Sequence, residues 1–268
     1  MIKNVITPKR YLGQNFLQHQ GIIFEILNAC NFHHEDKVVE IGPGLGALTV
    51  YLLKYLSKII AIEIDADLQT TLNSLPNASE KLELLTQDAL TVDFAQWGSE
   101  IRIIGNLPYN ISTPLLFHLL KFVVYIKDMH FMLQKEVVDR ITAAPGSKHY
   151  GRLSIMLQIS CAVDDILDVP PQAFTPQPKV QSKVIRLRPY TISPYSAVNQ
   201  TTLSNIVRKA FAMRRKTIIN NLKCILNIKD LRAIKINPNA RPEQIAIEDY
   251  VKIANYIDNL GDTLVSAL

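Results

Sequence analysis

The pattern of apolar and polar positions changes along the chain and divides it into two parts. Up to about residue 190, short apolar runs rich in β-branched residues alternate with segments whose apolar residues recur at helical spacing. The short runs predict strands over residues 37–41, 59–64, 82–86, 101–104 and 127–133. The helical spacing predicts helices over residues 21–30, 45–56, 67–75 and 114–122. Such alternation is typical of an α/β domain in which a mostly parallel sheet carries helices on both faces.

Beyond Pro189 the pattern is helical only, with helices predicted over residues 203–222, 230–234 and 247–260. The run PPQAFTPQP, residues 170–178, predicts an ordered loop, because proline removes backbone donors from helices and sheets. We therefore expect an α/β domain over residues 1–190 and a small all-helical domain over residues 191–268.

Charge changes the interpretation of the second part. Residues 1–190 hold 18 basic and 18 acidic side chains, whereas residues 191–268 hold 11 basic and 6 acidic ones. The 61 residues from 169 to 229 contain eleven Lys or Arg and no Asp or Glu. Because all the charged residues of this segment are basic, it is more consistent with a surface that binds an anionic partner, nucleic acid above all, than with an ordinary solvent-exposed surface of mixed charge. Some of its basic residues would serve only for solubility, and the candidates for phosphate contacts are Arg208, Lys209, Arg214, Arg215 and Lys216.

Cysteine spacing, histidine spacing and the length of apolar runs argue against a disulfide-bonded, metal-binding, membrane-spanning or secreted protein. Cys30, Cys161 and Cys224 are widely spaced and form no CxxC pair, which predicts reduced thiols in a cytoplasmic protein. The six histidines show no metal-ligand spacing, so we expect no metal. No apolar run is long enough to span a membrane, and residues 1–10 lack the apolar centre of a signal peptide.

A glycine-rich turn follows the first predicted strand, in residues 40–46 (EIGPGLG). Glycines between a strand and a helix let the backbone approach a ligand closely, which makes Gly42 and Gly44 candidate cofactor-binding residues. A nicotinamide dinucleotide is the competing ligand, but its motif is G-x-G-x-x-G, and the spacing here is G-x-G-x-G. Pro43 interrupts the amides that would hold a pyrophosphate, and Glu40 adds charge that opposes it. A ligand with ammonium and sulfonium groups, such as S-adenosylmethionine, suits these residues.

Carboxylates follow the next two predicted strands. Glu63 ends the run IIAIE 21 residues after the first glycine of the turn, where an acid can accept both hydroxyls of a ribose. Asp65 is the less favoured alternative. Asp88 would accept the exocyclic amine of an adenine, with Ala89 leaving room for the ring. Because open α/β sheets bind ligands at the carboxyl ends of their strands, these motifs predict one nucleoside pocket.

Residues 105–113 (GNLPYNIST) follow the strand predicted over residues 101–104, beside that pocket. Asn106 and Tyr109 would then face the methyl group of the cofactor, and the implied substrate is an exocyclic amine on an aromatic base. The side-chain oxygen of Asn106 and the carbonyl of Leu107 would hold its two N–H groups, so that the nitrogen lone pair points at the methyl group. Pro108 fixes the turn, and Tyr109 offers a ring face to a base extracted from its stack. Catalysis would rest on positioning and hydrogen bonding rather than on a tuned general base.

These motifs together resemble those of the ribosomal RNA adenine N6-dimethyltransferases, and the resemblance covers nearly the whole chain. Further matching segments are PKRYLGQNFL, LQKEVVDRI, PGSKHYGRLS, FTPQPKVQS and FAMRRKTIINNL. The resemblance implies a Rossmann-like class I S-adenosylmethionine-dependent methyltransferase domain followed by helices. It also implies transfer of four methyl groups to N6 of two adjacent adenosines in the hairpin loop near the 3′ end of 16S rRNA, during 30S subunit maturation. By position, it adds Asn15 and Leu17 to the cofactor site.

The resemblance also implies that Phe174 stacks on the other face of the target base. From the residues alone, an aromatic ring between prolines is equally consistent with a core position. Lys9 and Arg10, beside Tyr11 and Gln14, are either a solvated tail or a lid over the cofactor. We expect a monomer that binds rRNA in the cytoplasm without a membrane partner.

Two other functions stay open at this point. A relative that methylates large-subunit rRNA and confers macrolide resistance shares the cofactor motifs, but the FTPQPKVQS loop and the long basic helical region favour the small-subunit branch. The second alternative is a binding protein, either an assembly factor or a mitochondrial-type transcription factor, that uses this fold to hold nucleic acid. The intact NLPY motif favours an active enzyme.

Overall fold

The computed structural model describes residues 8–265, apart from the side chains of Arg10 and residues 261–265. Residues 1–7 of the N-terminal stretch considered for a signal peptide lie outside the described part. The chain forms two compact units. The first extends to Val138 and includes Ala162–Pro189, and the second comprises Asp139–Cys161 and the chain from Tyr190 onward. The expected boundary at residue 190 stays a prediction.

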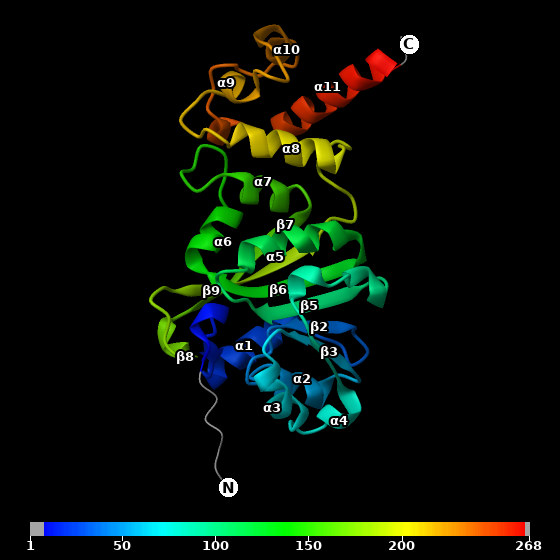
Figure 1. Cartoon of the computed structure of the whole chain (residues 1–268), viewed down its shortest axis with the longest axis vertical. Helices are drawn as coiled ribbons and strands as arrows, with labels where there is room; N and C mark the ends of the chain where they lie inside the picture. Colours follow the sequence, from blue (N-terminus) through cyan, green and yellow to red (C-terminus); the bar gives the residue numbers. More distant parts are fainter. Residues whose placement is uncertain (1–7, 266–268) are drawn as a thin grey trace. The chain divides into compact units, whose positions relative to one another are not determined.

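A seven-stranded sheet, whose strands are labelled in Figure 1, has the order β4-β3-β2-β5-β6-β9-β7. The first five of these pair in parallel, and β9 runs antiparallel to β6. The strand order reverses between β2 and β5, which is the position where open α/β sheets form their binding crevice. The strands are β2 (Val38–Ile41), β3 (Ile59–Glu63), β4 (Leu82–Thr86), β5 (Ile101–Asn106), β6 (Ile126–Gln134), β7 (Cys161–Val169) and β9 (Ser182–Pro189).

Helices connect these strands in the first unit, and the four that the sequence pattern predicts there correspond to α1, α2, α3 and α5, whereas α4 and α6 were not predicted. The α-helices are α1 (Gln20–Cys30), α2 (Thr49–Tyr55), α3 (Gln69–Asn73), α4 (Ala78–Lys81), α5 (Ser112–Leu119) and, extending past Val138, α6 (Lys135–Ile141). Short 3₁₀ turns are η1 (Arg10–Leu12), η2 (Ala66–Leu68), η3 (Ala89–Thr91), η4 (Phe94–Trp97), η5 (Leu120–Tyr125) and η6 (Pro171–Ala173). The helix α1 ends at Cys30 and is capped by Asn31, which adopts the left-handed conformation that terminates many helices.

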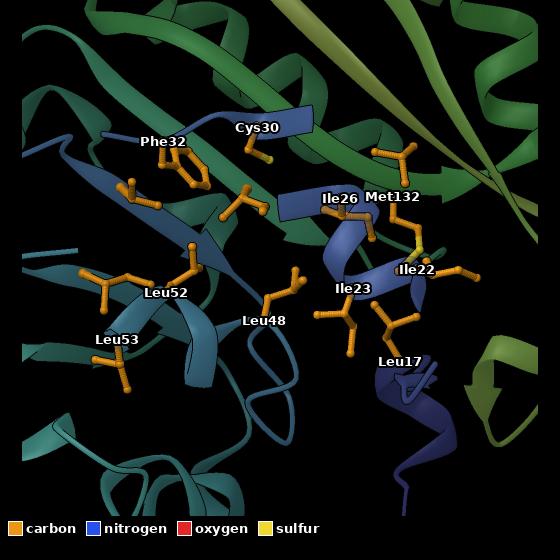
Figure 2. Close-up of a cluster of buried hydrophobic side chains, with 14 of the residues drawn as sticks. Leu17, Ile22, Ile23, Ile26, Cys30, Phe32, Leu48, Leu52, Leu53 and Met132 are labelled. Carbon is orange, nitrogen blue, oxygen red and sulfur yellow. The ribbon is translucent and has the colours of Figure 1, made fainter. Parts of the chain in front are cut away.

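The core under α1 and α2 supports the site that lies at the strand ends. Figure 2 shows Ile23 and Ile26 of α1 gathered with Leu52 of α2, Met132 of β6 and Leu17 in one buried cluster. Burial of this apolar surface is the main term that stabilises these layers. Leu17 therefore ties a short N-terminal segment to the core.

That segment belongs to a second, two-stranded sheet. Strand β1 (Phe16–Leu17) pairs antiparallel with β8 (Phe174–Thr175), and Leu17 lies opposite Phe174. The proline-rich stretch 170–178, which we expected to be an ordered loop, thus contains η6 and the short strand β8.

The second unit is helical apart from its loops. Its helices are α7 (Arg152–Gln158), α8 (Gln200–Ala210), α9 (Ile218–Leu222), α10 (Ile228–Ala233), η7 (Pro242–Gln244) and α11 (Ile247–Val265). Helices α8 and α11 pack against each other (Figure 1). Among the described residues, no helix is long and apolar enough to span a membrane.

The prediction of one helix over residues 203–222 is wrong. The helix α8 ends at Ala210 and α9 begins at Ile218. Asn221 explains the break, because its amide accepts a hydrogen bond from the Met213 N–H at 3.0 Å and donates one to the Met213 carbonyl at 3.2 Å. Such side-chain bonds replace the helical ones that the backbone would otherwise make.

Candidate active site

A pocket that opens to solvent lies at the carboxyl ends of β2, β3 and β5. Its walls come from the glycine-rich turn, the NLPY turn and the N-terminal segment around β1. The lining residues are Leu12, Gly13, Gln14, Asn15, Phe16, Leu17, Glu40, Gly42, Pro43, Gly44, Leu45, Ala47, Leu48, Glu63, Ile64, Asn106, Leu107, Pro108 and Tyr109.

Strand register brings the polar residues of this pocket to one face of the sheet. Glu40 lies opposite Ala61 of β3 and opposite Ile104 of β5. Side chains two residues apart on a strand share a face, so Glu63 and Asn106 point to the same side as Glu40. Glu40 and Glu63 were predicted on separate strands and Asn106 in the loop after a third strand, whereas the structure places Asn106 at the end of β5, so the sheet gathers all three at its carboxyl edge.

The glycine-rich turn adopts a conformation that other residues rarely take. Gly42 and Gly44 have φ angles of 68° and 58°. A Cβ atom at Gly44 would also come within 3.0 Å of the Phe16 ring. Both glycines therefore let the backbone pass close to the pocket.

Gly105 is required for a different reason. A Cβ atom there would lie 2.5 Å from the Ile41 carbonyl oxygen, which is closer than any real contact of this kind. The absence of a side chain lets β5 approach the end of β2 closely. The NLPY turn therefore begins directly beside the glycine-rich turn.

Glu63 is held by backbone amides. Gly44 N–H donates to its Oε2 at 3.1 Å, and Asp65 N–H donates to its Oε1 at 3.0 Å. Burial raises the pKa of this carboxyl group, while the amide bonds oppose that shift. The carboxylate is thus fixed at the strand end, where it could accept the hydroxyl groups of a sugar.

Glu40 is buried at the base of the pocket. Thr49 Oγ1 donates to its Oε2 at 2.7 Å. Burial raises the pKa of Glu40 to about 7, and the nearby Glu63 carboxylate adds to the shift. A cationic group in the pocket would favour the ionised form of this side chain.

The Asn106 amide is oriented by the N-terminal segment. Its Nδ2 donates to the Asn15 carbonyl at 2.9 Å. This bond assigns the nitrogen to Asn15 and leaves Oδ1 as the acceptor offered to a ligand. Asn15, which we expected in the cofactor site, thus determines which atom Asn106 presents.

The rest of the NLPY turn is tied to neighbouring strands. Leu107 N–H donates to the Met132 carbonyl on β6 at 3.2 Å. The Pro108 carbonyl accepts from Ser112 N–H at 3.1 Å, which starts α5. Tyr109 is half-buried, and its hydroxyl is hydrogen-bonded to the Ser182 hydroxyl at 2.9 Å.

Asp65 attaches the N-terminal segment instead of lining the pocket. Lys9 Nζ lies 2.5 Å from its Oδ1, and Gln14 Nε2 donates to its Oδ2 at 2.8 Å. Asp67 adds a second carboxylate 2.6 Å from Lys9. These ion pairs raise the pKa of Lys9 and help to lower that of Asp65. Residues 9–14 are thus held across the end of β3.

Three of the residues predicted to contact the cofactor or the target base do not line the pocket, namely Asp88, Ala89 and Phe174. Asp88 Oδ1 accepts from Leu90 N–H at 2.9 Å and caps η3, where Ala89 is buried. Phe174 is 4% exposed and belongs to the core cluster under α1. Their proposed ligand contacts stay predictions.

The predicted phosphate contacts lie in the second unit. Arg208 and Lys209 are exposed in the last turn of α8, and Arg215 and Lys216 are exposed in the turn that follows. Arg214 is exposed too, but its guanidinium donates to the carbonyls of Lys148 and Tyr150 and anchors the loop before α7. Among the described residues, no group of His, Cys, Asp and Glu could hold a metal ion.

Sequence reasoning did not identify Phe16, Thr49 or Ser182. Phe16 forms a wall of the pocket, Thr49 bonds Glu40, and Ser182 bonds Tyr109. Thr49 and Ser182 are 9 and 73 residues from their partners, and no spacing rule reports such contacts. Only the FTPQPKVQS segment pointed toward Ser182, without giving it a role.

A family model described as ribosomal RNA adenine dimethylase matches residues 6–259. A ribosomal RNA small subunit methyltransferase A from Legionella pneumophila (strain Philadelphia 1) is 57% identical to this chain over 253 residues, which cover 94% of this chain and 99% of that protein. The protein of the same name from Idiomarina loihiensis is 49% identical over 251 residues, covering 93% of this chain and 87% of that protein.

Two solved structures share the fold. A dimethyladenosine transferase from Plasmodium falciparum is 27% identical, with a TM-score of 0.78, and the match covers 92% of this chain and 98% of that one. The 23S rRNA methyltransferase ErmE is 21% identical, with a TM-score of 0.69, over 91% of this chain and 100% of that one, which shows the fold alone. These likenesses confirm the expected Rossmann-like α/β fold with C-terminal helices.

Proposed function

Because this chain belongs to the ribosomal RNA adenine dimethylase family, we propose that it dimethylates two adjacent adenosines at N6, in the hairpin loop near the 3′ end of 16S rRNA. The methyl donor is S-adenosylmethionine, and the substrate is the immature 30S subunit in the cytoplasm. The relatives named small subunit methyltransferase A support the choice of subunit. The observation that carries the chemistry is the hydrogen bond from Asn106 Nδ2 to the Asn15 carbonyl, which leaves Oδ1 of this pocket-lining residue as the acceptor for a substrate.

The residues present fit the donor. Glu63 offers a fixed carboxylate for the ribose hydroxyls, and Gly42 and Gly44 leave room for close approach of the backbone. Glu40 supplies negative charge toward the cationic end of the ligand, and Phe16 and Ile64 supply apolar walls. S-adenosylmethionine, when bound, would supply a methyl group on a sulfonium sulfur.

The protein's own part in catalysis is to shape the adenine amine. Its N6 lone pair is delocalised into the ring, which makes it a poor nucleophile. Asn106 Oδ1 and the Leu107 carbonyl accept its two hydrogen bonds and favour a more tetrahedral nitrogen. Tyr109 supports the ring. The nitrogen forms the new N–C bond as the bond between the methyl carbon and the sulfonium sulfur breaks, which would leave a neutral thioether, and the methylated nitrogen, now cationic and acidic, would release its proton to solvent. Positioning of this kind lowers the barrier without a general base.

Substrate binding draws on the second unit. Its basic residues contact rRNA phosphates, which fix the position of the RNA without reading its sequence. The target adenosine is unstacked to reach the pocket, as for other enzymes that modify bases.

The test uses S-adenosylmethionine labelled in the methyl group and 30S particles that lack the modification. We expect label at adenosine N6, in up to two methyl groups on each of two neighbouring nucleotides. Labelling of 50S precursors in place of 30S particles would show the large-subunit activity instead. Binding to 30S particles without any transfer would show an assembly factor.

Asn106→Ala should lower the transfer rate by at least about a hundredfold, because it removes an acceptor aimed at the reacting nitrogen. Donor affinity should change far less, since Glu63 and the glycine-rich turn stay in place. Asn110→Ala is the matched control, because Asn110 is exposed in the same turn and does not line the pocket. Equal rates for Asn106→Ala and wild type would contradict the role of Asn106.

A further inference from the structure

The Tyr109 hydroxyl makes a hydrogen bond that joins distant parts of the chain. Its partner is the Ser182 hydroxyl, 2.9 Å away and 73 residues later in the sequence. Ser182 is 0% exposed. A buried hydroxyl without a partner is costly, so both groups gain from this pairing.

The sheet fixes the position of Ser182. It is the first residue of β9, where it pairs with Gln134 on β6. One residue earlier, the Gln181 carbonyl accepts from Lys135 N–H at 2.9 Å. Ser182 is therefore held by the backbone pairing of β9 with β6 and by the hydrogen bond at the preceding residue. In the sheet, β6 lies between β9 and β5, the strand that leads into Tyr109.

The backbone of Tyr109 is held by another buried serine. Ser112, 1% exposed, donates from Oγ to the Tyr109 carbonyl at 3.1 Å. The main chain is thus fixed at the start of α5, and the ring is fixed at its far end by Ser182. With the backbone fixed, the Tyr109 side chain can still rotate about its Cα–Cβ and Cβ–Cγ bonds. The hydrogen bond from its hydroxyl to Ser182 limits these rotations and so restricts the tilt of the ring.

We propose that Ser182 is a positioning residue, which holds the Tyr109 ring at the angle needed to stack on the target adenine. This inference rests on the proposed function, because it assigns the ring to an unstacked base. Ser182 does not itself touch the substrate. Burial raises the pKa of Tyr109, so the phenol stays protonated and able to bond to Ser182 at neutral pH.

The role is tested by Ser182→Ala, Tyr109→Phe and the double variant, in single-turnover transfer from S-adenosylmethionine to unmodified 30S particles. Each single variant should lower the transfer rate about five- to tenfold, because each removes the same bond and leaves the ring in place. The double variant should be no more than about twofold slower than either single variant. The donor Kd and the 30S Kd should stay within about twofold of wild type, since neither depends on the tilt of the ring.

Ser154→Ala is the matched control, because Ser154 is also 0% exposed and its hydroxyl also bonds within the fold, to the Arg140 carbonyl. It should lower the melting temperature without slowing transfer.

Three results would overturn the proposal: an unchanged rate for Ser182→Ala, multiplicative losses in the double variant, or an equal rate loss for Ser154→Ala. If Ser182→Ala does not fold, Tyr109→Phe decides alone, and an unchanged rate there counts against the proposal. An inactive wild-type protein would instead refute the proposed function, on which Ser182's role depends.

Discussion

Glu40 shows how one residue can lower stability in order to serve a site. Its side chain is buried, with Thr49 as its hydrogen-bond donor and the Glu63 carboxylate nearby. Its pKa is about 7, against 4.5 for an ordinary glutamate. An ionised acid in this position is unfavourable until a cationic ligand compensates it.

The stability of the ligand-free protein should therefore depend on pH through Glu40. Folding raises the pKa, so the stability that this group contributes is present below about pH 4.5 and is lost as the pH rises through about 7. Relative to wild type, Glu40→Gln should gain up to about 3 kcal/mol between pH 5 and pH 8. Urea unfolding at the two pH values measures the change. Glu80→Gln is the control, because Glu80 is exposed. The prediction would be refuted if the free energy of unfolding of Glu40→Gln, relative to wild type, changed as little between the two pH values as that of Glu80→Gln.

At the scale of elements, Arg102 links strands and loops at the opposite end of the sheet from the pocket. Its guanidinium binds both Asp128 oxygens, at 2.8 and 2.6 Å, and Asp36 at 2.7 Å. It also donates to the carbonyls of Asn31 and Cys30 and lies 4.6 Å from the centre of the Phe32 ring. One buried side chain thus joins β5, β6 and the connection between α1 and β2.

Arg102→Lys should lower the free energy of unfolding by about 3 kcal/mol, because a single ammonium group cannot bind Asp128, Asp36 and the two carbonyls at once and leaves the buried Asp128 carboxylate incompletely paired. Chemical denaturation at pH 7 measures the loss. Lys58→Ala breaks a pair with Glu83 in which the lysine side chain is 65% exposed, and it should cost less than about 1 kcal/mol. Equal effects of the two variants would show that the Arg102 network adds no special stability.

The elements that could be predicted are those whose signal is local. All five expected strands are present, because buried parallel strands are short apolar runs with many β-branched residues. Strands β7 and β9 were not predicted, since charged residues such as Asp164 and Arg186 interrupt their apolar pattern. These charges pair with each other in the folded sheet, at 3.0 Å. Local hydrophobicity cannot show that such a pairing exists.

The distinction between local signals and long-range contacts also applies to the residues of the site. Glu63 and Asn106 could be predicted to share a pocket, because each ends a strand and parallel strands end at one edge. The contact from Asn15 to Asn106 joins residues 91 positions apart, and that from Ser182 to Tyr109 joins residues 73 apart. Such contacts depend on the order of the strands in the sheet, which the apolar pattern does not contain.

At the scale of the whole molecule, the pocket and the basic residues predicted to bind phosphate belong to different units. The lining residues of the pocket belong to the first unit. The basic residues 208–216 belong to the second, and within that group Arg214 differs from Arg215. Arg214 is engaged by the carbonyls of Lys148 and Tyr150, whereas the exposed Arg215 has its charge directed to solvent.

Arg215→Ala should therefore weaken 30S binding and reduce the slope of log K against log salt by about one, without changing donor affinity. Arg214→Ala should in addition lower the melting temperature, because it releases the loop before α7. Salt titrations of 30S binding, together with thermal unfolding, separate the two effects. Lys252→Ala serves as the control, since Lys252 is paired with Asp249 at 2.7 Å. A salt slope for Arg215→Ala equal to that of wild type would exclude a phosphate contact.

The two attachments of the N-terminal segment have a consequence for turnover. Under the proposed function, each rRNA receives four methyl groups, so spent donor must leave and fresh donor must enter between transfers. Residues 16 and 17 are fixed by backbone pairing with β8, whereas Lys9 and Gln14 are attached to Asp65 only through side chains. Side-chain attachments open more readily than a strand pair packed on the core. We therefore expect the contacts of Lys9 and Gln14 with Asp65 to open for donor exchange before β1 separates from β8, so that Phe16 and Leu17 keep their places in the pocket wall.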